Sequence, residues 1–240
     1  MTDTSWLSPR SNEDRQIMDN DILEFLQASL SAPFSGTDSL LFLRIPKNAS
    51  SSIMESLGTR NVVKKYEKKL QESLDKNIYK DFFTATHARP HELQKVIGSI
   101  ELDCFSFAVA RNPWDRSVSM YHFAKKLGLG DLFGFSNDLS FERFCEVLES
   151  RDGDRSFMPV FKQTEWTHSS IKVNEILKFE NLSEDFSAMV KKHHIKDISP
   201  DLPHINSTAH KPYRDYFNSN TQKIIKKVFE EDCDLLKYVF

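Results

Sequence analysis

Cysteine is scarce in this chain. Its 240 residues include only three, Cys104, Cys145 and Cys233. They are odd in number and widely spaced, so they provide neither a disulfide framework nor the closely spaced pairs of a structural zinc site. This scarcity favours a protein of a reducing compartment.

An excess of positive charge is also absent, because the formal net charge is −3. Nucleic-acid binding through bulk charge is therefore excluded, and an anionic ligand would have to be held by a local group of cations. No apolar run approaches the roughly 20 residues that span a bilayer, and residues 1–16 contain no apolar core of signal-peptide length. The sequence predicts no membrane span and a cytoplasmic location.

What the chain does contain is typical of a soluble globular protein, with 39% hydrophobic and 28% charged residues. It shows no internal repeat, no low-complexity tract and no linker. We therefore expect a single domain over residues 39–240, preceded by a polar segment, residues 1–38, that includes a short helix at 21–30.

Apolar runs and helical periodicity alternate along this domain. Runs typical of strands occupy residues 39–45, 82–86, 104–110 and 175–179. Helical patterns occupy residues 50–57, 64–80, 90–97, 113–126, 140–148, 181–193 and 221–238. This order predicts an α/β fold of three layers, with a parallel sheet covered by helices on both faces. Ligands bind such sheets beyond the carboxyl ends of the strands.

The first strand is followed by the segment PKNASSS, residues 46–52, in which the next helix begins. Unpaired N–H groups and the positive end of the helix dipole favour an anion at such a place. Ser50, Ser51 and Ser52 add hydroxyl donors, and Lys47 adds a full charge. The segment departs from the ATP-binding pattern GxxxxGK[ST], because it has no glycine and its lysine precedes the hydroxyls. Alternatively, the serines only cap a helix and Lys47 faces solvent.

The strand at 104–110 is followed by a second polar segment, RNPWDRSVS, residues 111–119. Arg111 at the strand end and Ser119 on the next helix could together hold a second, separate phosphate. Three residues between them are given ordinary structural roles: Trp114 as a packing residue, Asp115 as a helix-start charge and Arg116 as an exposed or paired base.

These two segments resemble a known family. IPKNASSSI is similar to the 5′-phosphosulfate loop, and FAVARNPWDRSVSMYHF to the 3′-phosphate-binding strand and helix, of sulfotransferases that use 3′-phosphoadenosine-5′-phosphosulfate (PAPS). Within that family the chain most resembles the carbohydrate sulfotransferases, often bacterial, that are related to the Golgi enzymes. The later segments LKFENLSEDF and LPHINST resemble the same group, so the similarity covers roughly residues 39–240.

The resemblance implies a P-loop-like fold, PAPS as sulfuryl donor, a saccharide or other small polar acceptor, and no metal. It assigns cofactor binding to Lys47, Asn48, Ala49, Ser50, Ser51, Ser52, Arg111 and Ser119. Asn48 departs from the family pattern, since a hydroxyl residue is common there, but its amide can still donate a hydrogen bond. Lys211, in a proline-bracketed segment further on, could reach a cofactor phosphate, although a plain surface lysine explains it equally well.

Sulfuryl transfer is favoured by a cation beside the leaving oxygen and by a base that accepts the proton of the acceptor hydroxyl. The resemblance gives Lys47 the first role. His87 is the first candidate for the base, because a neutral imidazole suits deprotonation near neutral pH. His91 and Glu55 are the next candidates, and a hydrogen-bonded structural histidine is the alternative for His87. The remaining histidines lack the mutual spacing of a zinc site.

Two other functional classes stay open at this point. One is a nucleotide-dependent small-molecule kinase with an unusual phosphate loop, which the missing Gly-Lys-Ser/Thr order disfavours. The other is a catalytically inactive nucleotide-binding module that keeps the fold for interaction with a partner. The identity of the acceptor and the oligomeric state cannot be deduced from these residues.

Overall fold

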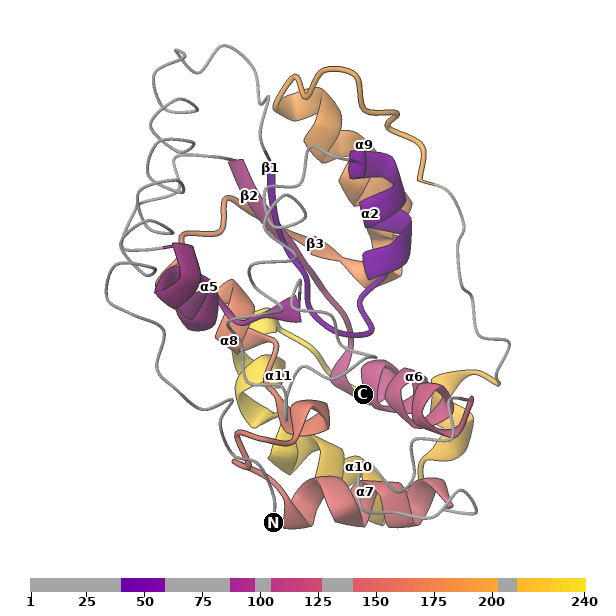
Figure 1. The fold of residues 1–240 in the computed structure, drawn as a ribbon. Helices are drawn as coiled ribbons and strands as arrows, with labels where there is room; N and C mark the ends of the chain where they lie inside the picture. The colour runs from indigo at the N-terminus through magenta and orange to yellow at the C-terminus, as the bar shows by residue number, and fades with distance from the viewer. Residues whose placement is uncertain (1–39, 59–86, 98–104, 127–139, 203–210) are drawn as a thin grey trace, which may run out of the picture.

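A computed structural model describes residues 40–58, 87–97, 105–126, 140–202 and 211–240 (Figure 1). The helices expected at 21–30 and 64–80 and the strand expected at 82–86 lie outside the described residues. In the part that the structure describes, no helix is long and apolar enough to cross a membrane.

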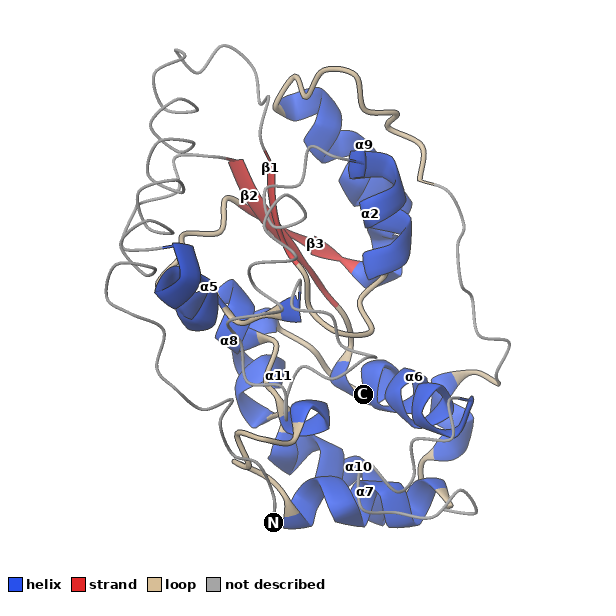
Figure 2. Ribbon diagram, viewed as in Figure 1, coloured by secondary structure: helices blue, strands red, loops and turns tan. Residues whose placement is uncertain are grey.

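The centre of the molecule is a sheet of three parallel strands in the order β1-β2-β3 (Figure 2). The strands are β1 (Leu40–Leu43), β2 (Phe105–Ala110) and β3 (Glu175–Lys178). Every residue of β1 and β2 is buried, which explains why both read as continuous apolar runs rather than as alternating patterns. The prediction of an α/β fold with a parallel sheet is confirmed.

Successive residues of each strand point to opposite faces of the sheet, and each face has its own core. Leu40 and Phe42 lie in the core shared with α2 (Ser50–Leu57) and α9 (Leu182–Lys192). Leu41 and Leu43 lie in the core on the other face. Figure 1 shows α2 and α9 together on one side of the sheet, with α5 and α8 on the other. Helices therefore cover both faces of the sheet.

The second core is formed by helices from several parts of the chain. They are α5 (Pro90–Ile97), α6 (Pro113–Lys126), α7 (Phe141–Ser150), the single-turn α8 (Thr164–Thr167), α10 (Ser219–Val228) and α11 (Glu230–Leu236). The described residues also form three short 3₁₀ turns: η5 (Met158–Val160) between α7 and α8, η6 (Phe179–Asn181) between β3 and α9, and η7 (Tyr213–Tyr216) before α10. Trp166 of α8, Val118 of α6 and Ile225 of α10 are among the buried residues of this core.

Local signals set most helix boundaries as expected. The helices predicted at 50–57, 90–97 and 113–126 have those bounds in the structure. Gly58, which follows the first of them, has a φ of 53° that suits glycine. The helix predicted from Ser140 begins at Phe141, because the Ser140 side chain accepts a hydrogen bond from the Arg143 N–H and so caps it.

The single helix predicted over 221–238 is wrong. The chain leaves the helical conformation at Phe229, with φ −115° and ψ 33°, and a second helix, α11, starts at the next residue. Phe229 is 2% exposed, so the break buries its ring in the core. Three acidic residues then occupy the first turn of α11, where the helix dipole favours negative charge: Glu230, Glu231 and Asp232.

Candidate functional site

The carboxyl ends of the three parallel strands meet at one edge of the sheet, where the sequence predicts a ligand site. The Arg111 Nη1 atom donates to the carbonyl oxygen of Lys47 at 2.9 Å. The Arg111 guanidinium carbon also lies 3.9 Å from the centre of the Phe179 ring, which follows β3. The structure thus brings together the two polar segments that follow β1 and β2.

The loop between β1 and α2 has an unusual backbone. Lys47 and Ala49 have φ values of 71° and 56°, in the left-handed region that residues with a side chain rarely adopt. The Ser50 hydroxyl donates to the carbonyl oxygen of Ile45 at 3.2 Å, which folds the loop back on the end of β1. Conformations of this kind direct successive backbone N–H groups toward one place and are found at anion sites.

Helix α2 starts in this loop without a side-chain cap. Its N-cap residue is Ala49, which makes no capping hydrogen bond, and its first turn has no acidic residue. By contrast, α7 is capped by Ser140, and α10 by a capping box built on Asn218. The alternative in which a serine is the cap of this helix is wrong. In the described part of the chain, no N-cap side chain or first-turn carboxylate offsets the positive end of α2, which favours an anion there.

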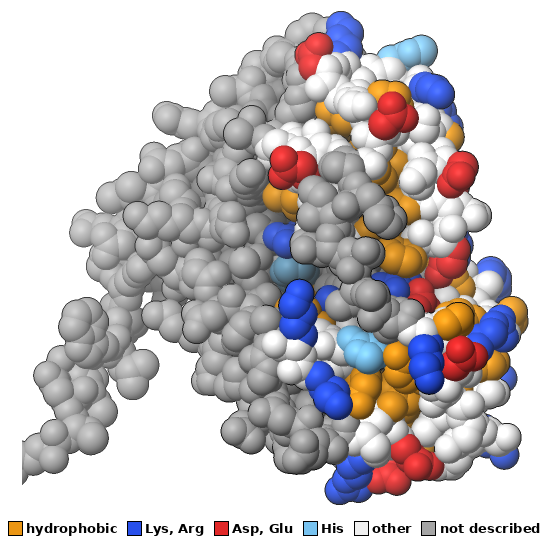
Figure 3. All heavy atoms as spheres, turned by 90° about the vertical axis from the view of Figure 1, so that its right-hand side faces the viewer, with side chains coloured by type: hydrophobic (Ala, Val, Ile, Leu, Met, Phe, Trp, Pro, Cys, Tyr) orange, Lys and Arg blue, Asp and Glu red, His pale blue; other side chains and the backbone are white. Residues whose placement is uncertain are grey.

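Lys47 is held over a ring instead of extending freely into water. Its Nζ atom lies 3.9 Å from the centre of the Phe123 ring, which comes from α6. Burial, and then the positive charges of Arg111 and Lys126, lower the pKa of Lys47 to about 8. Figure 3 shows several Lys and Arg side chains, with acidic side chains between them, on the lower half of the face that carries α6. Because the neighbouring cations destabilise the charged form of Lys47, binding of an anion beside Lys47 is favoured.

Arg111 is 7% exposed and has an acidic partner that the sequence analysis did not assign. Its Nε atom donates to Asp115 Oδ2 at 2.8 Å. Asp115 lies in the first turn of α6, as expected for a helix-start charge, and it also forms this ion pair with Arg111. The i, i+4 spacing of the two residues could have indicated the pair. Nη2 of Arg111 makes no hydrogen bond with the described residues and can still donate to a phosphate.

Asn48 differs from expectation. Its side chain is 1% exposed, and its amide nitrogen donates to Val109 O at 2.6 Å and to Gln163 Oε1 at 2.7 Å. Both amide protons are therefore used inside the protein, so the expectation that they donate to a ligand is wrong. Asn48 holds the loop in place, and its part in cofactor binding stays a prediction for its backbone alone.

The other predicted cofactor-binding residues differ in exposure. Ser50 and Ser52 are each 8% exposed and Ser119 is 4% exposed, whereas the side chains of Ser51 and Lys211 are exposed to solvent. Ala49 supplies the left-handed loop position described above. Whether these residues touch a cofactor stays a prediction.

His87, the first candidate for the base, is 7% exposed and lies just before α5. The next residue, Ala88, accepts a hydrogen bond from Trp166 Nε1 at 3.2 Å. Arg89 Nη2 donates to Glu92 Oε1 at 2.7 Å, so the segment around His87 is firmly attached. His91 is half-buried and Glu55 is exposed. The assignment of the base stays a prediction.

Sequence reasoning missed the buried polar groups behind the loop. Arg116, expected to be exposed or paired, is 2% exposed and donates to Pro46 O at 3.2 Å and Phe161 O at 3.0 Å. Burial lowers its pKa to about 10. Trp114 is 3% exposed, which confirms its packing role. Among the described residues, no group of His, Cys, Asp or Glu could hold a metal ion.

A protein-family model described as the sulfotransferase family matches residues 32–239, which is most of the chain. The chain belongs to the sulfotransferase family. No match was found among curated proteins or among solved structures. Membership of the sulfotransferase family supports sulfuryl transfer as the general reaction. The three parallel strands and their helices are consistent with it.

Proposed function

We propose that this sulfotransferase takes the sulfuryl group of PAPS and transfers it to a hydroxyl of a saccharide or another small polar acceptor. The single observation that carries the proposal is the meeting of Lys47 and Arg111 at neighbouring strand ends, where Arg111 Nη1 bonds Lys47 O at 2.9 Å. One domain over residues 39–240, with a P-loop-like arrangement of its phosphate loop, is part of the same proposal.

The residues at this edge suit a donor that carries two separate phosphate positions. Lys47, the backbone of residues 48–52 and the hydroxyls of Ser51 and Ser52 would hold the 5′-phosphosulfate, beside the uncapped start of α2. The Ser50 hydroxyl already donates to Ile45 O, so Ser50 would contribute through its backbone. Arg111 and Ser119 would hold the 3′-phosphate. Arg111 is rigid enough for this task, because Asp115 and the Phe179 ring fix its orientation.

PAPS, when bound, supplies an activated sulfuryl group. The protein contributes position and charge. Lys47 stabilises the negative charge that develops on the leaving phosphate oxygen as the bond from that oxygen to sulfur breaks. His87 accepts the proton of the acceptor hydroxyl as the new oxygen–sulfur bond forms. No covalent bond to the protein is required.

Ligand specificity tests the donor assignment. Adenosine 3′,5′-bisphosphate should raise the melting temperature of the protein, whereas ATP with magnesium should have little effect. The reverse result would favour a kinase. Incubation with PAPS labelled in the sulfuryl group and a panel of saccharides and other hydroxyl compounds should transfer the label. Binding of the bisphosphate without transfer to any of them would favour an inactive module.

A further inference from the structure

The side chain of Gln163 lies between the two loops that we propose bind the phosphates of the donor. Gln163 is 0% exposed. Its Oε1 atom accepts from Asn48 Nδ2 at 2.7 Å and from the Arg111 N–H at 2.9 Å. Its Nε2 atom donates to the Arg111 carbonyl at 2.8 Å. Gln163 therefore pairs with both backbone groups of Arg111 and joins them to the loop after β1.

Gln163 is itself held by the C-terminal part of the chain. Asp232 of α11 is 0% exposed, and its two carboxylate oxygens accept from the N–H groups of Gln163 and Thr164, each at 3.0 Å. They satisfy two backbone donors at the start of α8, as an N-cap side chain would. Arg116, whose positive charge interacts with Asp232, bonds the carbonyl of Pro46 in the loop after β1.

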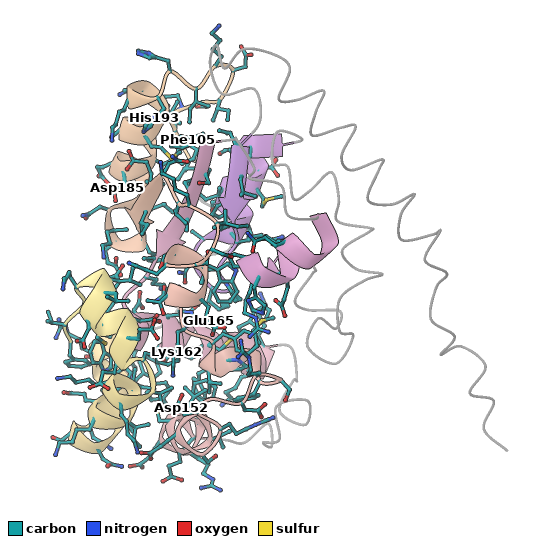
Figure 4. The ribbon with its side chains drawn as sticks, turned by 90° about the vertical axis from the view of Figure 1, so that its left-hand side faces the viewer. Phe105, Asp152, Lys162, Glu165, Asp185 and His193 are labelled. Atoms are coloured by element: carbon teal, nitrogen blue, oxygen red, sulfur yellow. The ribbon has the colours of Figure 1, made fainter. Side chains whose placement is uncertain are left out.

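The same short helix is attached to the segment that carries His87. Trp166 Nε1 donates to Ala88 O at 3.2 Å, and Arg89 Nη1 donates to Glu165 Oε2 at 3.2 Å. Figure 4 shows Glu165 and Lys162 on the segment that runs between the sheet and the helix near Asp152. Residues 163–166 thus contact all three segments to which the proposed function assigns a role.

We propose that Gln163 is a positioning residue that fixes the distance between the 5′-phosphosulfate loop and the 3′-phosphate loop. This inference rests on the proposed function. A ligand with two phosphates gains affinity when the loops are held at the right separation, because the second contact then needs no further ordering of the protein. A ligand with one phosphate gains nothing from that separation. Gln163 would therefore strengthen simultaneous binding of the two phosphate positions by the two loops, without contacting the ligand itself.

The test compares three nucleotides. Gln163→Met should weaken the binding of adenosine 3′,5′-bisphosphate about 10- to 100-fold, a partial loss of the roughly 10²- to 10⁴-fold that two linked contacts can supply. The same variant should weaken adenosine 5′-monophosphate and adenosine 3′-monophosphate less than about threefold. Isothermal titration of each nucleotide gives the comparison. An equal loss for all three, or no loss for the bisphosphate, overturns the proposal.

Two further variants guard against a general effect on folding. Phe186→Leu in α9 alters the core on the opposite face of the sheet, so it should lower stability and leave all three affinities unchanged. Gln163→Asn keeps the amide group on a shorter side chain and serves as the test if Gln163→Met does not fold. It should likewise weaken binding of the bisphosphate more than binding of either monophosphate. Loss of bisphosphate affinity in Phe186→Leu as large as in the Gln163 variants overturns the proposal.

Hydrogen exchange separates this inference from the donor assignment. Peptides that contain residues 46–50 and residue 111 should exchange faster in the Gln163 variant than in the wild type, while a peptide from α9 should be unchanged. If the wild-type protein does not bind the bisphosphate at all, the donor assignment fails, and faster exchange still supports the link between the loops. Unchanged exchange in both loops overturns that link.

Discussion

Two cations, the half-buried Lys47 and the buried Arg116, lie at the loop after β1 in opposite electrical surroundings. Lys47 is in the loop, and the charges that act most on it are the cations Arg111 and Lys126. Arg116 bonds the loop from behind, and the charges that act most on it are the carboxylates of Asp232 and Glu165. Burial lowers the pKa of both groups, but among the described residues only Arg116 has negative charge that offsets the cost of its burial.

This difference distinguishes a ligand site from a structural support. The carboxylates of Asp232 and Glu165 balance the charge of Arg116 within the protein. Removal of Arg116 should therefore lower the free energy of unfolding. No carboxylate of the described residues balances the charge of Lys47 in this way. Removal of Lys47 should therefore lower activity and improve the stability of the unliganded protein. Sites of function commonly carry such a loss of stability.

The largest effect is expected for Arg116→Ala. The substitution breaks hydrogen bonds to Pro46 O and Phe161 O and leaves Asp232 buried without its nearby cation. Loss of one partner of a buried charged group typically costs about 3–5 kcal/mol. The free energy of unfolding, measured with urea, should fall by this amount. Arg143→Ala, which breaks an exposed ion pair with Glu146, is the control and should change it by about 0–1 kcal/mol.

Lys47→Ala is expected to have the next largest effect, this time on activity. If Lys47 stabilises charge that develops in the transition state, kcat/KM for PAPS should fall by about 10²- to 10³-fold. The affinity for adenosine 3′,5′-bisphosphate should fall much less, because that product lacks the sulfuryl group. A parallel loss of affinity and of kcat/KM would show that Lys47 acts only in binding.

His87→Asn is the comparison variant for this measurement. It should also lower turnover, with the affinity for the bisphosphate nearly unchanged. In the wild type and in Lys47→Ala, kcat/KM should decline at acid pH, where a protonated imidazole cannot accept the acceptor's proton. The decline should be absent from His87→Asn. A variant with wild-type turnover and an unchanged pH profile would make His87 structural, and His91 and Glu55 the next candidates.

Arg111→Ala should have a smaller effect, on nucleotide discrimination. Loss of a charged contact to a partly buried phosphate costs about 2–5 kcal/mol, and the lower end applies here because Asp115 already neutralises part of the Arg111 charge. Titration should show this loss for adenosine 3′,5′-bisphosphate and little change for adenosine 5′-monophosphate. Equal losses for the two nucleotides would contradict the 3′-phosphate assignment.

The parts of this picture that the sequence predicted depend on local signals. Gly58, Pro90, Pro113 and Ser140 mark helix boundaries through backbone geometry and capping, which need no knowledge of the rest of the chain. The meeting of Lys47 and Arg111 followed from the rule that parallel strands end at one edge. These inferences required only the order of the elements along the chain.

The supporting groups could not be predicted in the same way. Gln163 bonds Asn48 across 115 positions of sequence and Asp232 across 69, and no periodicity or motif links those residues. The use of the Asn48 amide inside the protein depends on those distant partners, so the sequence alone suggested a free donor. The break at Phe229 likewise results from tertiary packing, which overrides a helical pattern.

Lys47→Met should raise stability, in contrast to Arg116→Ala. Below pH 8, Lys47 is charged in both the folded and the unfolded protein, and its lowered pKa means that folding is opposed by burial of that charge. We expect a gain of about 1–2 kcal/mol at pH 7, or about 2–8 °C in melting temperature for a chain of this length. The gain should shrink as the pH rises from 8 to 10.5 and the wild-type lysine becomes neutral in the folded state. An unchanged or lower melting temperature at pH 7 would remove the distinction between the two cations.

The smallest effect concerns the pH at which Lys47 loses its charge. Because its pKa is lowered to about 8, the affinity for adenosine 3′,5′-bisphosphate should fall as the pH rises through that value, while the phosphates, with second pKa values near 6, stay ionised. Lys126 contributes to the lowering, so Lys126→Ala should move the midpoint upward by less than about one pH unit. Lys125→Ala is the control and removes the neighbouring positive charge from the last turn of α6. Lys125 is not among the charges that lower the pKa of Lys47, so this variant should leave the midpoint unchanged. In Lys47→Met the transition should disappear. A midpoint that moves equally in both alanine variants would mean that general surface charge, and not the position of Lys126 beside Lys47, sets the affinity of this site for anions.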